Sequence, residues 1–203
     1  MQNKLYIQES INHEKLNTDL VFIRSFLDLS KSIGFRLILS GGYGIYFYLH
    51  QITRDHDDVD LIIYGLAERA EAGNLIGNWL KSLLNNPTIK ITPEMFYEDI
   101  DVNSQALKAN LYYVHTTNDP YKDLQHIIRQ DGKNIENSID RFPTPVSGKL
   151  NDITVEVQDP CSHLADILYK RRNQENRINH DQDIQNLRLV TDEKRVSSIL
   201  ALM

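Results

Sequence analysis

The sequence is poor in cysteine and in long apolar runs, and these absences narrow the class of protein. Cys161 is the single cysteine among 203 residues, so no intramolecular disulfide can form. No apolar run approaches the roughly 20 residues that a membrane-spanning helix needs. The first ten residues, MQNKLYIQES, lack the basic segment and apolar core of a signal peptide. We therefore expect a cytoplasmic protein with no membrane partner.

An excess of positive charge is also missing. The 22 Lys and Arg residues are outnumbered by 28 Asp and Glu residues, which gives a formal net charge of −6. This balance argues against broad attraction to nucleic-acid phosphates, so we expect no stable nucleic-acid binding. It mildly favours a neutral or cationic molecule as the binding partner. There is no internal repeat, and 41% hydrophobic with 25% charged residues is typical of a globular protein.

Familiar histidine and cysteine sites are absent as well. Cys161 has no neighbour in the sequence that indicates a nucleophilic dyad or a zinc site. None of the histidines shows metal-ligand spacing such as His-Glu-x-x-His; those outside the central motif are His13, His50, His115, His126, His163 and His180. Carboxylates therefore become the main candidates for chemistry.

The segment 36–64, RLILSGGYGIYFYLHQITRDHDDVDLIIY, is the most informative part of the chain. Its two short apolar runs, 37–39 and 61–63, are bounded by turn signals and predict buried strands. Between them, 43–50 is long enough for about two turns of helix. Glycines after a strand let the backbone approach a ligand closely, and the helix that follows would point its N–H groups at an anion.

Two carboxylates stand at the start of the second run. Asp58 and Asp60 are separated by one residue on a predicted strand, so both side chains leave the same face. They repel each other, and a divalent cation is the usual means of holding such a pair. Magnesium prefers carboxylate, phosphate and water oxygens. The segment therefore predicts a magnesium-nucleotide site.

Simpler interpretations of these features exist. Gly41 and Gly42 alone would indicate a tight turn, and the acids alone would indicate a solvated loop. A solvated loop does not require the observed order, however. The glycine pair is followed by Arg54, His56, the two acids and an apolar strand, and this order favours the functional interpretation.

The same residues resemble the nucleotidyltransferase superfamily of DNA polymerase beta. The resemblance is strongest to the small antibiotic nucleotidyltransferases that act on lincosamides and on the 2″ hydroxyl of aminoglycosides. Their pattern of Gly-Gly, a short helix and Arg-x-His-x-Asp-x-Asp is matched by Gly41, Gly42, Arg54, His56, Asp58 and Asp60. A weaker likeness extends to Asp183 and covers most of the chain.

The resemblance implies an α/β (α+β) fold with a nucleotidyltransferase-type mixed sheet flanked by helices. Residues 1–158 would form the nucleotidyltransferase domain, and 159–203 a small helical C-terminal extension packed on it. The implied enzyme transfers a nucleoside monophosphate from a magnesium-bound nucleoside triphosphate, with ATP the expected donor, to a hydroxyl of an antibiotic-like acceptor. Two alternatives remain open: a nucleotide-binding regulator that has lost transfer, and an adenylyltransferase that modifies a protein. The oligomeric state is not indicated.

The resemblance also implies roles for individual residues. Asp58 and Asp60 are expected to hold magnesium, while Ser40, Gly41 and Gly42 would cradle the β and γ phosphates.

Three further residues are candidates for binding the nucleotide. Arg54 would bind the triphosphate or lock its own loop through Asp55 or Asp57. His56 would either contact the nucleotide or serve as a structural hydrogen-bonding group. Lys170, on a helix near the C-terminus, is the best further cationic candidate.

A third carboxylate is implied on a later strand, and the sequence departs from the pattern there. Tyr113 stands at the matching place, and tyrosine is a poor magnesium ligand and a poor base at neutral pH. Glu156, on the last predicted strand, is the substitute that we expect to be catalytic. Asp99 and Asp101, beside a predicted hairpin turn, are the alternatives.

Periodicity and turn residues predict the remaining elements. Helices are expected at about 12–32, 67–84, 121–129, 159–172, 181–189 and 192–202. Strands are expected at 35–39, 61–64, 89–91, 95–100, 109–115 and 153–157, with a turn at 101–105 and a loop at 134–148.

Overall fold

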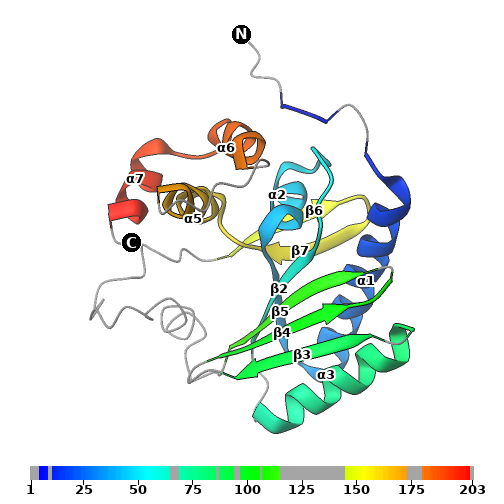
Figure 1. The fold of residues 1–203 in the computed structure, drawn as a ribbon. Coiled ribbons are helices and arrows are strands. Elements are labelled where there is room, and N and C mark those ends of the chain that lie inside the picture. Colours follow the sequence, from blue (N-terminus) through cyan, green and yellow to red (C-terminus); the bar gives the residue numbers. More distant parts are fainter. Residues whose placement is uncertain are drawn as a thin grey trace.

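A seven-stranded mixed sheet forms the centre of the computed structural model, with the strand order β3-β4-β5-β2-β1-β7-β6 (Figure 1). The structure describes residues 5–8, 11–64, 69–85, 87–93, 97–105, 107–114, 145–172 and 180–201. The strands are β1 (Arg36–Leu39), β2 (Val59–Tyr64), β3 (Thr88–Pro93), β4 (Tyr97–Asn103), β5 (Lys108–Val114), β6 (Val146–Leu150) and β7 (Ile153–Val157). β2 lies between antiparallel β1 and parallel β5, and β1 also pairs in parallel with β7. The predicted α/β class is confirmed.

Six helices are present in the described part of the chain. They are α1 (His13–Ile33), α2 (Gly41–Leu49), α3 (Arg69–Leu83), α5 (Pro160–Arg172), α6 (His180–Arg188) and α7 (Glu193–Ala201). α1 begins after Asn12, whose side chain accepts a hydrogen bond from the backbone of Lys15, and ends at Gly34 with a left-handed φ of 90°. Among the described helices, none is long and apolar enough to cross a membrane.

One face of the sheet forms the main hydrophobic core. Alternate residues of the strands point to it and pack with α1, α2 and α3; they include Leu37, Leu39, Leu61, Ile63, Ile100, Val102, Ala109 and Leu111. Because side chains alternate along a strand, the residues between them leave the opposite face. Asp60, Asp101 and Asn110 belong to that opposite set, so the core fixes the side on which the polar residues gather.

A second core joins the C-terminal helices to the rest of the fold. Ile45 of α2 packs among buried apolar residues of α5, α6 and α7, while Phe47 of the same helix packs in the main core. α2 therefore touches both cores, and in Figure 1 it lies between the sheet and the C-terminal helices. The proposed boundary between residues 158 and 159 stays a prediction.

Three local predictions are wrong. α2 begins at Gly41 rather than at residue 43, so the glycine pair forms its first turn. β4 continues to Asn103, because Ile100 and Val102 are buried and carry Asp101 into the strand; the turn follows it. β6 occupies the end of the stretch expected as a loop, where it pairs with β7. The expected helix at 121–129 and the rest of that loop up to residue 144 lie outside the described residues.

Candidate active site

Asp58 and Asp60 lie together beside an amide side chain on the neighbouring strand. The parallel pairing of β2 and β5 sets Asn110 opposite Asp60. Nδ2 of Asn110 donates to Oδ2 of Asp58 at 3.1 Å and to Oδ1 of Asp60 at 2.9 Å. The shared donor shows that both carboxylates point to one place, as the alternation along the strand predicts. It also offsets part of their repulsion, because a donated N–H stabilises each negative charge.

The first turn of α2 runs against these carboxylates. Gly41 has a left-handed φ of 57°, and a Cβ placed on it would lie 2.0 Å from Oδ2 of Asp60. A Cβ on Gly42 would lie 1.5 Å from Cε1 of His56. Only glycine fits at either position, so the pair brings backbone close to Asp60 and His56. No side-chain hydrogen bond caps this end of the helix, and such an end attracts anions.

Ser40 is tied into the protein rather than turned toward a ligand. Its backbone N–H donates to the carbonyl oxygen of Asp60, and its hydroxyl donates to Oε1 of Gln158 at 2.8 Å. Gln158 in turn donates from Nε2 to Asp166 at 2.7 Å. The hydroxyl proton expected to bind phosphate is therefore used within the protein, which leaves the backbone N–H groups of α2 as donors.

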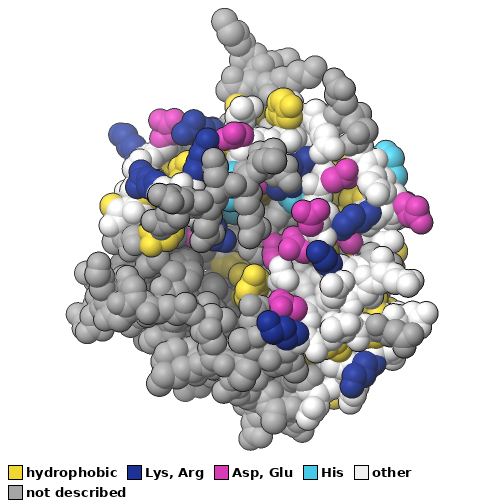
Figure 2. Space-filling view, in the orientation of Figure 1, with side chains coloured by type: hydrophobic (Ala, Val, Ile, Leu, Met, Phe, Trp, Pro, Cys, Tyr) yellow, Lys and Arg dark blue, Asp and Glu magenta, His cyan; other side chains and the backbone are white. Residues whose placement is uncertain are grey.

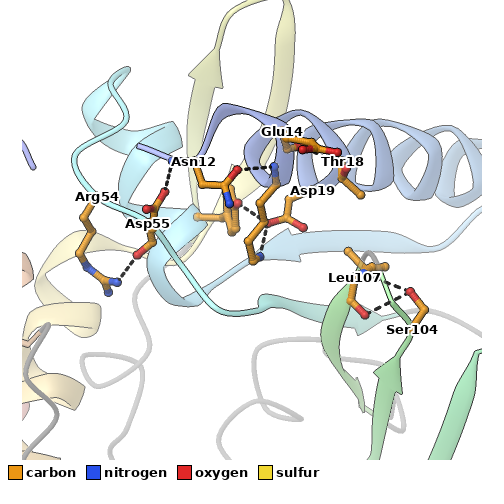
Figure 3. Close-up of polar contacts among 10 residues, drawn as sticks. Asn12, Glu14, Thr18, Asp19, Arg54, Asp55, Ser104 and Leu107 are labelled. Carbon is orange, nitrogen blue, oxygen red and sulfur yellow. Dashed lines mark hydrogen bonds and ion pairs between the residues drawn. The ribbon is translucent and has the colours of Figure 1, made fainter. Parts of the chain in front are cut away.

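Arg54 does not reach toward a phosphate, which corrects one of its two expected roles. Its guanidinium is buried and forms a two-pronged ion pair with Asp183 of α6, from Nε at 2.9 Å and from Nη2 at 2.6 Å. Nη1 donates to the carbonyl oxygen of Asp55 at 2.7 Å, as Figure 3 shows. The second expected role, locking the loop, is the observed one. The main partner of Arg54 is Asp183 on α6, which lies outside the loop.

The N-terminal residues hold the same loop from its other side. Oδ1 of Asp55 accepts the backbone N–H of Asn12 at 2.8 Å, a contact that Figure 3 shows beside the start of α1. The backbone N–H of Asp55 donates to Oε1 of Gln8 at 3.1 Å. The loop that leads into Asp58 is therefore fixed to both ends of the chain.

His56 is buried beneath the glycine turn. Its ring packs against Tyr46 and Tyr43, with ring centroids 4.7 and 5.6 Å away. Burial, followed by the charge of Arg54, lowers its pKa well below the usual value, so the ring is neutral. Within the described residues, Nε2 has no hydrogen-bond partner. Contact between this nitrogen and a nucleotide stays a prediction.

A second neutral histidine lies beside Lys170. His163 is buried on α5, and its Cε1 lies 4.0 Å from the position that a Cβ on Gly44 would take. Burial, followed by the nearby charge of Lys170, lowers the pKa of His163 to about 3. Lys170 itself is exposed in the last turn of α5, so its role in binding a nucleotide stays a prediction.

The structure does not support the two expectations about a third acidic position. Tyr113 is paired with Ile63, three residues beyond the pair formed by Asp60 and Asn110, so it does not stand at the matching place. Glu156 lies on β7 and forms an ion pair with Arg36. Its partner on β1, Ile38, pairs with Ile62, so Glu156 is offset from Asp60 by two residues along the strands as well as lying two strands away. Asn110, a neutral residue, occupies the position beside the carboxylates.

Sequence reasoning missed Asn110 although a signal for it existed. Ala109 and Leu111 are both buried, so the residue between them had to share the face of Asp60. One strand further, Asp101 pairs with Asn110 in the register of β4 and β5. Asp60, Asn110 and Asp101 thus form a polar row across three strands. Figure 2 shows acidic side chains near the middle of this view, between the sheet and the C-terminal helices.

Comparisons with known proteins identify the fold. The model of the aminoglycoside-2″-adenylyltransferase family matches residues 22–74, about a quarter of the chain, which includes the glycine turn and both aspartates. The antibiotic-resistance factor ANT(2″)-Ia, in complex with adenylyl-2″-tobramycin, superposes with a TM-score of 0.64 and 16% identity, over 91% of this chain and 95% of its own. The chain has a nucleotidyltransferase fold.

Two further structures share the nucleotidyltransferase fold. The lincosamide antibiotic adenylyltransferase LnuA, bound to lincomycin, gives a TM-score of 0.55 and 14% identity over 90% of this chain and all of its own. An antigenic nucleotidyltransferase-like protein from Paracoccidioides brasiliensis gives 0.54 and 14%, over 94% of this chain and 87% of its own. No curated protein sequence matches the chain.

The buried ion pair should control the stability of this nucleotidyltransferase fold. Arg54→Met leaves the carboxylate of Asp183 buried without its partner and should lower the free energy of unfolding by about 3–5 kcal/mol. Arg54→Met combined with Asp183→Leu should regain most of the loss, because both charges are gone. Urea unfolding measures all three proteins. Arg24→Met, which removes an exposed pair with Asp152, is the control and should leave the midpoint nearly unchanged. Equal urea midpoints for Arg54→Met and Arg24→Met would contradict this account.

Acid should destabilise the fold through His163. Its pKa is about 3 in the folded protein and about 6.5 when unfolded, so below pH 6.5 the unfolded chain binds a proton that the folded chain does not. Stability should therefore fall as the pH drops from 6.5 to 4.5, by up to about 1.4 kcal/mol per pH unit for this residue. His163→Gln should reduce the slope and leave the part due to His56, whereas His13→Gln, at an exposed position, should keep the full slope. Unfolding at a series of pH values measures this, and unchanged slopes in His163→Gln would refute it.

Proposed function

We propose that the protein is a nucleotidyltransferase that moves a nucleoside monophosphate from a magnesium-bound nucleoside triphosphate to a hydroxyl of a small molecule, with release of pyrophosphate. The observation that carries the proposal is the meeting of Asp58, Asp60 and the glycine turn of α2 at one place. Oxygen ligands and backbone N–H donors lie side by side there, and a metal-bound triphosphate requires both.

The residues present fit a magnesium ion. Asp58 and Asp60 offer carboxylate oxygens on one side, and Asn110 lies within hydrogen-bond reach of both. When bound, magnesium would offset the negative charge that develops on the phosphates during in-line displacement. Among the described residues, no group of three or more His, Cys, Asp or Glu side chains forms a metal site, so two acids would hold the ion.

The glycine turn would hold the phosphates. The backbone N–H groups at Gly41 and Gly42 open a helix that no side chain caps, and a bound phosphate would supply the missing acceptor. The tight fit of Gly41 against Asp60 would keep these donors next to the metal ligands. The phosphates and the metal ion would therefore bind next to each other.

The relatives support a donor and an acceptor class. ANT(2″)-Ia was solved with adenylyl-2″-tobramycin, and LnuA with lincomycin. We therefore propose ATP as the donor and an antibiotic-like molecule with a free hydroxyl as the acceptor. The net charge of −6 is compatible with a cationic acceptor.

Asp101 is our candidate for the group that accepts the proton of the acceptor hydroxyl. It pairs with Asn110 across β4 and β5, so its carboxylate leaves the face that carries Asp60. In the proposed step the hydroxyl oxygen forms a bond to the α phosphorus, its proton passes to Asp101, and the bond to pyrophosphate breaks. Asp99 was the alternative, and its side chain lies outside the described residues.

The metal ligands give the most direct test of the function. Asp58→Asn should abolish magnesium-dependent ATP binding and nucleotide transfer while leaving the fold intact, because a buried core and not this carboxylate holds β2. Calorimetry with ATP and magnesium, followed by a transfer assay with aminoglycosides and lincosamides, measures both. Asp57→Asn, at the exposed neighbouring position, is the matched control and should behave as the natural protein. Full transfer by Asp58→Asn would refute the proposal.

A transfer assay also separates the proposed base from the metal site. Asp101→Asn should lower kcat by about 100-fold, the usual range for losing a general base, while ATP and magnesium bind as before. If Asp101→Asn kept the rate of the natural protein, another group would accept the proton. If the natural protein bound ATP but modified no acceptor, the non-catalytic alternative would hold.

A further inference from the structure

Asn110 is a neutral residue that lies among acidic residues. Its amide nitrogen donates to both carboxylates, and its backbone pairs with Asp60 on one side and Asp101 on the other. It is therefore a neutral side chain in the middle of the polar row. The two hydrogen bonds set its orientation, because the amide oxygen in the same place would face two other acceptors.

We propose that Asn110 is a neutral third ligand of the metal site, which turns its amide when a divalent cation binds. Without the cation, Nδ2 holds Asp58 and Asp60 together. With the cation, rotation about the last side-chain bond exchanges the two ends of the amide and presents Oδ1 to the ion. This inference rests on the proposed function, because it concerns the same metal site.

The chemistry of the amide carries the inference. Asparagine has two donors on nitrogen and an acceptor oxygen at nearly the same distance from the backbone, so one side chain can serve both states. Magnesium accepts neutral oxygen ligands along with carboxylates. The two aspartates alone would bring a charge of −2 to the ion, and Asn110 adds a ligand without adding charge. Binding should therefore be weaker than in a site with three carboxylates, which would repel one another strongly when empty.

Binding of Mn²⁺ without nucleotide tests the role, because the signal of free Mn²⁺ in electron paramagnetic resonance reports binding and needs no turnover. Asn110→Asp keeps the shape and adds a charged oxygen, so it should bind Mn²⁺ about tenfold more tightly. Asn110→Leu removes the oxygen and should weaken binding about tenfold. Asn103→Asp is the matched control, since it adds the same charge at an exposed position of β4, and it should bind as the natural protein does.

Thermal unfolding with and without Mn²⁺ gives a second readout. Asn110→Asp should melt below the natural protein without the ion, because three carboxylates then repel, and Mn²⁺ should raise its melting temperature by more than it raises that of the natural protein. This comparison stays valid even if Asn110→Leu fails to fold.

The outcomes separate this inference from the function on which it rests. If Asp58→Asn abolishes Mn²⁺ binding while both Asn110 variants bind as the natural protein does, Asn110 only joins the carboxylates and the inference is wrong. If the natural protein binds no Mn²⁺, or Asp58→Asn binds it unchanged, the proposed metal site and the inference both fail. Tighter binding by Asn110→Asp, with Asn103→Asp unchanged, supports the inference.

Discussion

The buried ion pair between Arg54 and Asp183 is the interaction on which the arrangement of the site depends. Arg54 is only 7% exposed, and its charge is costly to bury unless a carboxylate meets it with good geometry. Its partner lies on α6, 129 residues away in sequence. Docking of the C-terminal helices therefore helps to fix the loop that delivers Asp58 to the sheet, together with the contacts from Gln8 and Asn12. This makes those helices part of the structure of the site, even though no metal or phosphate ligand is assigned to α6.

A second constraint is the balance of charge around Asp58 and Asp60. Their repulsion is reduced by the amide of Asn110 and by the positive end of α2, which the glycine turn brings against Asp60. The neighbouring His56 stays neutral because burial lowers its pKa. The negative charge of the site therefore lies on the two aspartates, which could bind a divalent cation. The hydrogen-bond donors are backbone N–H groups, which could bind phosphates.

Features of the fold and the site could be predicted from the sequence when the residues that determine them lie close together along the chain. The glycine turn, the helix that it begins and the two aspartates at the start of a strand are encoded within about twenty residues, and all of them could be predicted. The contact of Arg54 with Asp183 spans 129 residues, and that of Asn110 with Asp60 spans 50. Local alternation indicates the face on which Asn110 lies, but local patterns encode neither partner. Asp101 was assigned to a turn because its polarity outweighed the buried residues on either side. Glu156 was chosen for its charge, although it is paired with Arg36 and the strand register offsets it from Asp60.

A crystal structure with magnesium and an ATP analogue that cannot be cleaved between its α and β phosphates would test the central claim most directly. The account predicts one ion between the carboxylates of Asp58 and Asp60, and phosphate oxygens within hydrogen-bond distance of the backbone N–H groups at Gly41 and Gly42. Arg54 should still be paired with Asp183. A nucleotide bound elsewhere, or an ion that touches neither aspartate, would contradict the claim that these residues form the catalytic site.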